Sequence, residues 1–189
     1  LAGSSTPGDD RGLTELGRGF LETLERVGAE SAGPKPLVDL AHLNPKAAGE
    51  ALAWFEADDS RASRLIPVYS HGALAHPGFS TPRAISSENL RRLRALGGVV
   101  GFSVGPPFYS TADELKAGLE AAAATPFRGR AGFEGLAIGT DFLGVEQTLP
   151  GLGNVPEVID WLASTFDPTT AAALVHGNAF ALIERMLGG

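Results

Sequence analysis

The sequence predicts an α/β protein in which short parallel strands alternate with helices. Four short apolar segments, residues 37–41, 65–70, 99–104 and 136–139, are each followed by a longer segment with helical periodicity. These segments are almost continuously apolar, which is typical of strands buried on both faces of a parallel sheet. Strand and helix alternate about every 30 residues, and this order indicates right-handed parallel crossovers.

The first quarter of the chain contains a loop, a helix, a strand and a second helix. Residues 1–11 are small, polar and glycine-rich, which predicts a flexible loop. Residues 14–27 are expected to form a helix that ends at Gly28. The apolar side chains that would form one face of this helix are Leu16, Phe20, Leu21, Leu24 and Val27. After the strand at 37–41, Asn44 and Pro45 fit the N-cap and first position of a helix that runs to about residue 57.

The rest of the chain repeats this alternation of strand and helix. Thr111 and Glu114 have the spacing of a capping box, which marks the start of one helix. Gly97 and Gly98 close the helix that precedes it. The remaining helices are expected at residues 87–96, 111–124, 155–164, 168–175 and 179–187.

The composition excludes several classes of protein. The 189 residues carry 15 Lys and Arg against 22 Asp and Glu, a formal charge of −7, so we expect no nucleic-acid partner. The absence of cysteine excludes disulfides, thiolate metal sites and a cysteine nucleophile. No apolar run approaches the length of about 18 residues that crosses a membrane. Any metal must therefore be held by His, Asp or Glu.

The number of strands raises a question about completeness. Four strand–helix units make either a small open sheet or half of an eight-stranded barrel, which typically needs about 250 residues. The chain begins with Leu1 rather than Met. We therefore expect residues 1–189 to be a single partial domain of a longer barrel.

Titratable side chains follow three of the predicted strands. His42 comes after the first strand, His71 after the second and Asp141 after the fourth. All strand C-termini of a parallel sheet open onto one face, where active sites lie. Adjacent strands are about 4.8 Å apart, so two imidazoles could reach one metal ion. A carboxylate from a nearby strand could then move a proton for a water activated by that ion.

Each of these residues also has an ordinary structural interpretation. A single histidine at a strand end is usually just hydrogen-bonded, and it is the pair that favours a metal. Arg83 lies on the same face, where it is either a surface arginine or a bidentate ligand for a substrate carboxylate. Asp39 could be buried and paired. We expect His76 to lie in a solvated loop and His176 at a helix boundary.

At these residues the sequence resembles the renal, or membrane, dipeptidase family of zinc hydrolases. Asp39-Leu-Ala-His42 and Pro67-Val-Tyr-Ser-His71 are similar to two strand ends of that family. Pro82-Arg83, Gly97-Gly98-Val-Val-Gly101 and Gly135-Leu-Ala-Ile-Gly-Thr-Asp141-Phe142 follow in the family's order. The resemblance runs from about Gly12 to Leu187.

The resemblance implies a fold and a set of roles. Members of the family are (β/α)8 barrels of the TIM type that hold two metal ions, usually zinc, and hydrolyse dipeptides. This chain would be the C-terminal half, strands 5–8. His42 and His71 would bind one zinc ion, Arg83 the substrate carboxylate, and Asp141 would accept the proton of the nucleophilic water and pass it to the leaving amine.

The chain also departs from the family pattern. The His-x-Asp pair of the first strand, the Glu that bridges the metals and a substrate-binding His are absent from it. Many relatives have an Asp where Leu143 stands, and an aromatic residue and Asn near Ser103 and Gly105. We therefore expect the isolated chain to be inactive, and we expect the missing N-terminal half or a partner chain to close the barrel.

Two alternatives to a dipeptidase remain open. The same His, His and Asp pattern occurs in wider amidohydrolase-like barrels that act on non-peptide amides or esters. The chain could instead be a non-catalytic half-barrel that assembles with itself or with another chain, since the outer strands of an open parallel sheet are bare edges.

Overall fold

The structure is a computed structural model that describes residues 2–6, 8–30, 33–76, 81–127, 129 and 131–188. The strands are short, with two or three residues each, and helices follow most of them. In chain order the elements are α1 (Glu15–Glu30), β1 (Leu37–Asp39), α2 (Pro45–Glu56), α3 (Arg61–Arg64), β2 (Ile66–Val68), β3 (Ala73–Leu74), β4 (Ala84–Ile85), α4 (Ser87–Ala95), β5 (Val100–Phe102), α5 (Ala112–Ala124), β6 (Leu136–Ile138), α6 (Val155–Thr165), α7 (Pro168–Ala172), a π-helical turn η1 (Ala173–Gly177) and α8 (Asn178–Met186).

The four predicted strands pair in parallel and follow one another in chain order. β1 pairs with β2, with Asp39 opposite Val68, and β5 pairs with β6. A parallel bridge between Tyr69 and Val100 joins the two pairs, because the Gly101 amide donates to the Tyr69 carbonyl. The predicted α/β class with parallel strands is therefore confirmed. The short parallel pair β3–β4 lies in the segment after β2 and was not predicted.

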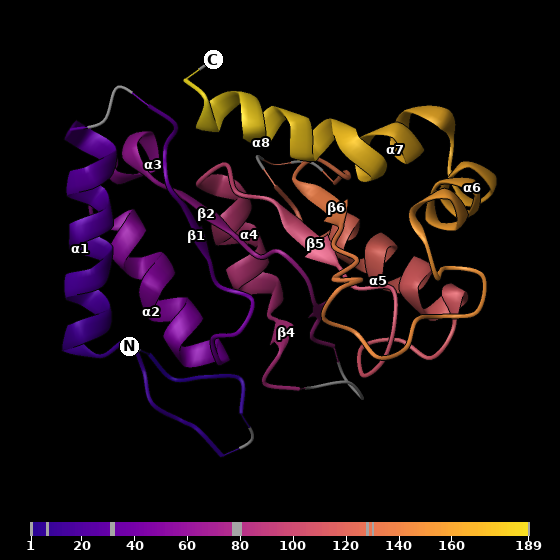
Figure 1. Ribbon diagram of the computed structural model, residues 1–189, viewed down its shortest axis with the longest axis horizontal. Coiled ribbons are helices and arrows are strands. Elements are labelled where there is room, and N and C mark those ends of the chain that lie inside the picture. Colours follow the sequence, from indigo (N-terminus) through magenta and orange to yellow (C-terminus); the bar gives the residue numbers. More distant parts are fainter. Residues whose placement is uncertain are drawn as a thin grey trace.

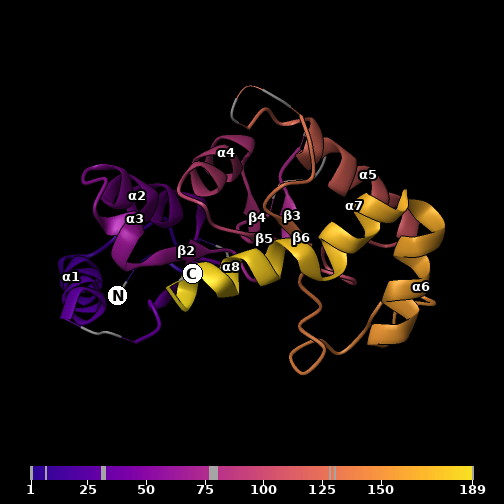
Figure 2. The same cartoon turned by 90° about the horizontal axis from the view of Figure 1, so that it is seen from above.

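Helices pack along one side of these strands and cover both ends of the molecule. In Figures 1 and 2, α1, α2 and α3 gather at one end, and α5, α6 and α7 gather at the other. The apolar residues of α2, α4 and α5 are buried in the same core as those of the strands. The largest apolar side chains with almost no exposure are Leu40, Leu52, Phe55, Leu65, Ile66, Leu90, Leu93, Phe102, Leu115, Leu119 and Leu136.

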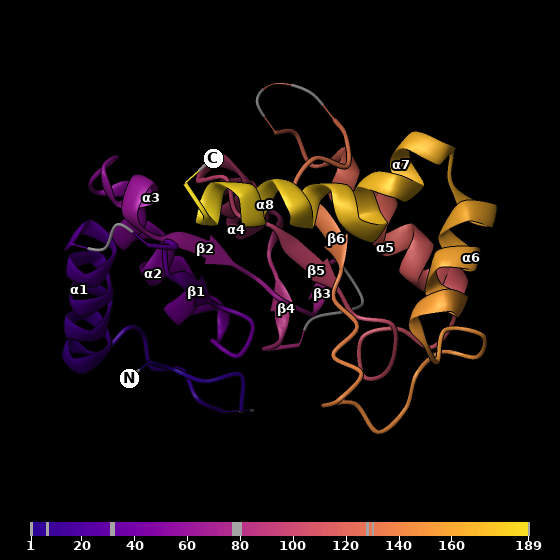
Figure 3. The same ribbon diagram turned by 45° about the horizontal axis from the view of Figure 1, so that its top comes forward.

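The final helix α8 runs across the end of the sheet at which the strands begin (Figure 3). Asn178 donates from its side-chain amide to the carbonyls of Phe133 and Leu136, at the start of β6. The Arg185 guanidinium donates to the Gly97 carbonyl, just before β5. The Lys35 amide, before β1, donates to the Met186 carbonyl. Because α8 covers the strand N-termini, the strand C-termini form the opposite face.

Several helix boundaries differ from the sequence prediction. α1 continues past Gly28 to Glu30, and most of its predicted apolar face is exposed, with Leu16 at 71% and Val27 at 48%. The helices predicted at 168–175 and 179–187 form one run, because the π-helical turn at Ala173–Gly177 joins α7 to α8. The short helix α3 was not predicted.

The segment before α1 makes specific contacts with the rest of the chain. The Asn44 side-chain amide donates to the carbonyls of Asp9 and Arg11, and the Ser5 amide donates to the His42 carbonyl. Residues 1 and 7 of the predicted loop lie outside the described residues. In the part of the chain that the structure describes, no helix is long and apolar enough to cross a membrane.

Candidate functional site

Two imidazoles meet at the C-terminal end of the β1–β2 pair. His42 lies three residues after β1, and His71 lies three residues after β2. Because the two strands are parallel and in register, both side chains come to the same end of the pair. Their ring centres are 5.0 Å apart and their planes meet at 63°. The structure thus brings together the two residues that the sequence pairs as metal ligands.

Asp141 approaches the same place from the end of β6. Its carboxylate Oδ2 lies 3.7 Å from Nε2 of His71. The backbone of Asp141 has φ of 50°, a left-handed conformation that is uncommon outside glycine. The turn that follows depends on Gly144, since a Cβ atom there would lie 2.6 Å from the Asp141 carboxylate. The local chain therefore holds this carboxylate toward the histidines at some cost in backbone strain.

Arg83 reaches the site from the segment that follows His71. Its Nη2 lies 3.4 Å from Nε2 of His71, and its guanidinium carbon lies 5.1 Å from the centre of the Phe108 ring. The hydroxyl of Tyr69, which is 2% exposed, donates to the Arg83 backbone carbonyl at 2.6 Å. Nε of Arg83 is buried and has no hydrogen-bond partner among the described residues. A buried donor of this kind can take up an acceptor from a ligand.

A cavity of about 480 Å³ adjoins three of the four predicted site residues. His71, Arg83 and Asp141 line it together with Ser103 and the segment from Gly144 to Gln147. This volume lies within the usual range of about 300–1,000 Å³ for small-molecule sites. Leu143 points into solvent with its side chain fully exposed.

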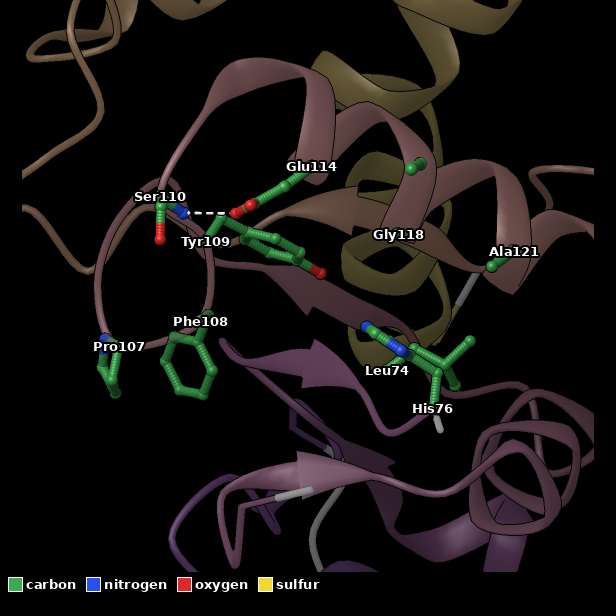
Figure 4. Close-up of a pocket in the computed structure, with 10 residues that line it drawn as sticks. Leu74, His76, Pro107, Phe108, Tyr109, Ser110, Glu114, Gly118 and Ala121 are labelled. Atoms are coloured by element: carbon green, nitrogen blue, oxygen red, sulfur yellow. Dashed lines mark hydrogen bonds between the residues drawn. The ribbon is translucent and has the colours of Figure 1, made fainter. Parts of the chain in front are cut away.

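A second cavity of about 540 Å³, whose lining is drawn in Figure 4, shares Pro107 and Phe108 with the first. Tyr109 and His76 face it, and Glu114 accepts a hydrogen bond from the Ser110 amide at its rim. It contains none of the four predicted site residues. His76 is exposed in the structure, in line with the expected loop position.

The charges around His71 have opposing effects on its pKa. Burial lowers the pKa of this imidazole, the neighbouring Asp141 carboxylate raises it, and His42 lowers it. The net direction is downward, which favours the neutral ring. The neutral imidazole is the form that binds metal ions.

The residues present fit part of a metal site. Two imidazoles with ring centres 5.0 Å apart are a suitable nitrogen donor pair for a divalent ion. In the described ranges, no group of three or more His, Asp or Glu side chains could hold a metal ion. Catalytic zinc usually has three protein ligands, so this pair supplies some of the ligands and not all.

The sequence indicated that Asp39 could be buried and paired, and it did not identify Tyr69 or Phe108. Asp39 is exposed rather than buried, and its carboxylate accepts hydrogen bonds from the amides of Ala41 and Ser70 and from the Ser70 hydroxyl. The alternation of side chains at the two strand ends could have indicated this contact. Tyr69 and Phe108 look like ordinary core residues in sequence, and no sequence signal distinguishes them. His176 lies inside the π-helical turn and not at a helix boundary.

Comparisons with known proteins identify a family and a fold. The family model described as membrane dipeptidase, peptidase family M19, matches residues 2–186. A curated protein, dipeptidase tcpJ of Claviceps purpurea, is 27% identical over 179 residues, which cover 94% of this chain and 36% of that protein. The chain therefore spans about a third of the length of this relative.

Solved structures with a similar fold include a metallo peptidase and an amidohydrolase. A metallo peptidase from Rhodobacter sphaeroides, liganded with a phosphinate mimic of the dipeptide L-Ala-D-Ala, has a TM-score of 0.69 and 22% identity. The match covers 96% of this chain and 49% of that one. An amidohydrolase from Pseudomonas aeruginosa has a TM-score of 0.70 and 21% identity, and the match covers 94% of this chain and 58% of that one.

Proposed function

Because the chain belongs to the membrane dipeptidase family, peptidase family M19, we propose that it is the C-terminal half, strands 5–8, of a metal-dependent dipeptidase with a (β/α)8 barrel. The observation that carries this proposal is the convergence of His42, His71, Arg83 and Asp141 from separate segments at one end of the parallel strands. The single partial domain would span residues 1–189.

His42 and His71 would hold a metal ion, which we propose is zinc. A zinc ion bound there would polarise the carbonyl of the scissile amide and make a water molecule nucleophilic near neutral pH. The bridging Glu and the ligands of the second metal would come from the missing N-terminal half. The downward shift in the pKa of His71 supports this role, because it keeps the ring neutral.

Arg83 and Asp141 would act on the substrate and on the proton. The guanidinium of Arg83 would bind the terminal carboxylate of a dipeptide, and the buried Nε without a partner supports that role. The Asp141 carboxylate would take a proton from water as the oxygen attacks the amide carbon. It would then give that proton to the nitrogen as the C–N bond breaks, so that an amine leaves.

The proposal includes a partner for the outer strand. β1 pairs only with β2 in the described residues, and α1 beside it exposes Leu16, Phe20 and Val27. The N-terminal half of the barrel, or another chain, would cover these groups. The alternative is another amidohydrolase-like metal hydrolase that acts on a non-peptide amide or ester, and the similarity to the Pseudomonas amidohydrolase bears on the fold alone.

A substrate panel tests the proposal. The isolated 189 residues should be inactive, and the full-length protein with zinc should hydrolyse L,L- or L,D-dipeptides. Arg83→Met in that protein should raise KM for a dipeptide much more than for the same dipeptide with an amidated C-terminus. Turnover by the isolated chain would contradict the proposed incompleteness, and activity only on non-peptide amides or esters would reject the dipeptidase.

A further inference from the structure

Asp39, Ser70 and His71 form a continuous hydrogen-bonded chain beside the candidate metal site. The Ser70 hydroxyl donates to Oδ2 of Asp39 at 2.5 Å, and the same oxygen Oγ lies 2.9 Å from Nδ1 of His71. The other oxygen of Asp39 accepts from the amides of Ala41 and Ser70, at 3.0 and 3.1 Å. One carboxylate thus ties together the two strand exits that carry His42 and His71.

The direction of these hydrogen bonds follows from the number of protons. A serine hydroxyl has one proton, and a carboxylate can only accept. The Ser70 proton is therefore committed to Asp39, so Oγ can only accept from His71. It follows that Nδ1 of His71 carries a hydrogen.

An independent contact on the other side of the ring agrees with this assignment. Nε2 of His71 lies 3.4 Å from Nη2 of Arg83, and a guanidinium nitrogen can only donate. Nε2 must then present a lone pair, as it does in the neutral ring with its hydrogen on Nδ1. The Ser70 and Arg83 contacts thus require the same tautomer, and the Asp141 carboxylate, whose Oδ2 lies 3.7 Å from Nε2, is beyond hydrogen-bonding distance.

We infer that Asp39 and Ser70 are positioning residues that fix His71 in its Nδ1–H tautomer, with the Nε2 lone pair facing the Arg83 guanidinium. In metal sites a ligating histidine almost always donates its second N–H to such a partner, which sets the tautomer and the ring orientation. Here the carboxylate acts through a serine. The assignment of Nε2 to a metal rests on the proposed function, whereas the tautomer does not.

The test is nitrogen NMR of the four histidines in the isolated chain, with no metal added, at about pH 8, where an imidazole of ordinary pKa near 6.5 is neutral. His71→Gln identifies the His71 signals.

We expect His71 to be protonated on Nδ1 in the wild type and in Ser70→Thr, which keeps the hydroxyl. Ser70→Ala should abolish this preference, and Asp39→Asn should weaken it, because an amide can also donate. Ser164→Ala and Asp160→Asn on α6 are matched controls, and His176 is an internal reference.

Two results would overturn the inference: a wild-type His71 protonated on Nε2, or a Ser70→Ala variant that keeps the Nδ1–H preference. If Ser70→Ala does not fold, Asp39→Asn still tests the inference, because an Nδ1–H preference as strong as in the wild type would contradict the role of Asp39. Zinc titration adds a second readout, since loss of such a partner typically weakens metal binding about 10–100-fold. A wild type with the inferred tautomer and no zinc binding would count against the proposed function and leave the tautomer assignment standing.

Discussion

The two histidines occupy equivalent places after neighbouring strands, yet their surroundings differ. The His71 side chain is only 12% exposed and lies within reach of Ser70, Arg83 and Asp141. His42 is exposed, and the strand before it has a pairing partner on one side only within the described residues. At the centre of the sheet each strand has a neighbour on both sides, whereas β1 is an edge strand in the described residues. A histidine three residues after a parallel strand is therefore held by neighbouring side chains at His71 and is exposed at His42.

The largest expected effect of this contrast is on stability. Phe102 in β5 is fully buried, whereas Phe20 in α1 is 47% exposed. We expect Phe102→Ala to lower the free energy of unfolding by about 3–5 kcal/mol. Phe20→Ala removes the same atoms from the edge and should cost about 1 kcal/mol or less. Urea unfolding of both variants measures the difference, and equal losses would show that the edge is packed as firmly as the centre.

A smaller change in stability is expected at Tyr69, the residue that follows β2. Tyr69→Phe removes the hydrogen bond to the Arg83 carbonyl and should lower the free energy of unfolding by about 0.5–1.5 kcal/mol. Ser103→Ala is the matched control, because the Ser103 hydroxyl is buried and has no partner in the described part of the chain. Its removal should leave stability unchanged or raise it. A loss for Ser103→Ala as large as that for Tyr69→Phe would contradict the assignment.

The smallest change in stability should appear at low pH, and only in the segment around Asp9 on the side of β1. Hydrogen bonds from Arg11 and Ser4 hold the pKa of Asp9 far below its ordinary value of 3.8. The unfolded chain binds this proton more readily, so the contribution of Asp9 to stability is present above pH 3.8 and is lost as the pH falls through the lower folded-state pKa.

Amide hydrogen exchange can detect this loss locally. On acidification, the Ser4 amide, which donates to Asp9, should lose protection before the Gly101 amide, which donates to Tyr69 at the centre. In Asp9→Asn, Ser4 should be poorly protected already at neutral pH. If Ser4 and Gly101 lose protection together, the edge and the centre do not behave as separate regions.

Much of this arrangement follows from the sequence, because apolar runs and helix caps are local signals. Asn44 and Thr111 cap the helices that were expected to begin there, and their side chains accept from Ala47 and Glu114. The strand-end positions of His42, His71 and Asp141 were visible for the same reason. The contact between Asp39 and Ser70 was missed, since it depends on strand register across 31 residues.

The exposure of α1 also could not be predicted. Helical spacing of Leu16, Phe20 and Val27 identifies an apolar face, but it does not say what covers that face. The continuation of the last helices through a π-helical turn depends on packing of Ala173–Gly177 against β6, which is a tertiary effect.

The most direct test of the central claim is zinc titration of the chain and of four single His→Gln variants. His42 and His71 form the candidate site, and His76 and His176 are matched controls elsewhere in the same chain. The account predicts one zinc site that weakens at least 10-fold, about the loss expected for even an indirect partner, in His42→Gln and in His71→Gln. It predicts no change in His76→Gln or His176→Gln. Zinc binding that survives both of the first two substitutions would contradict it.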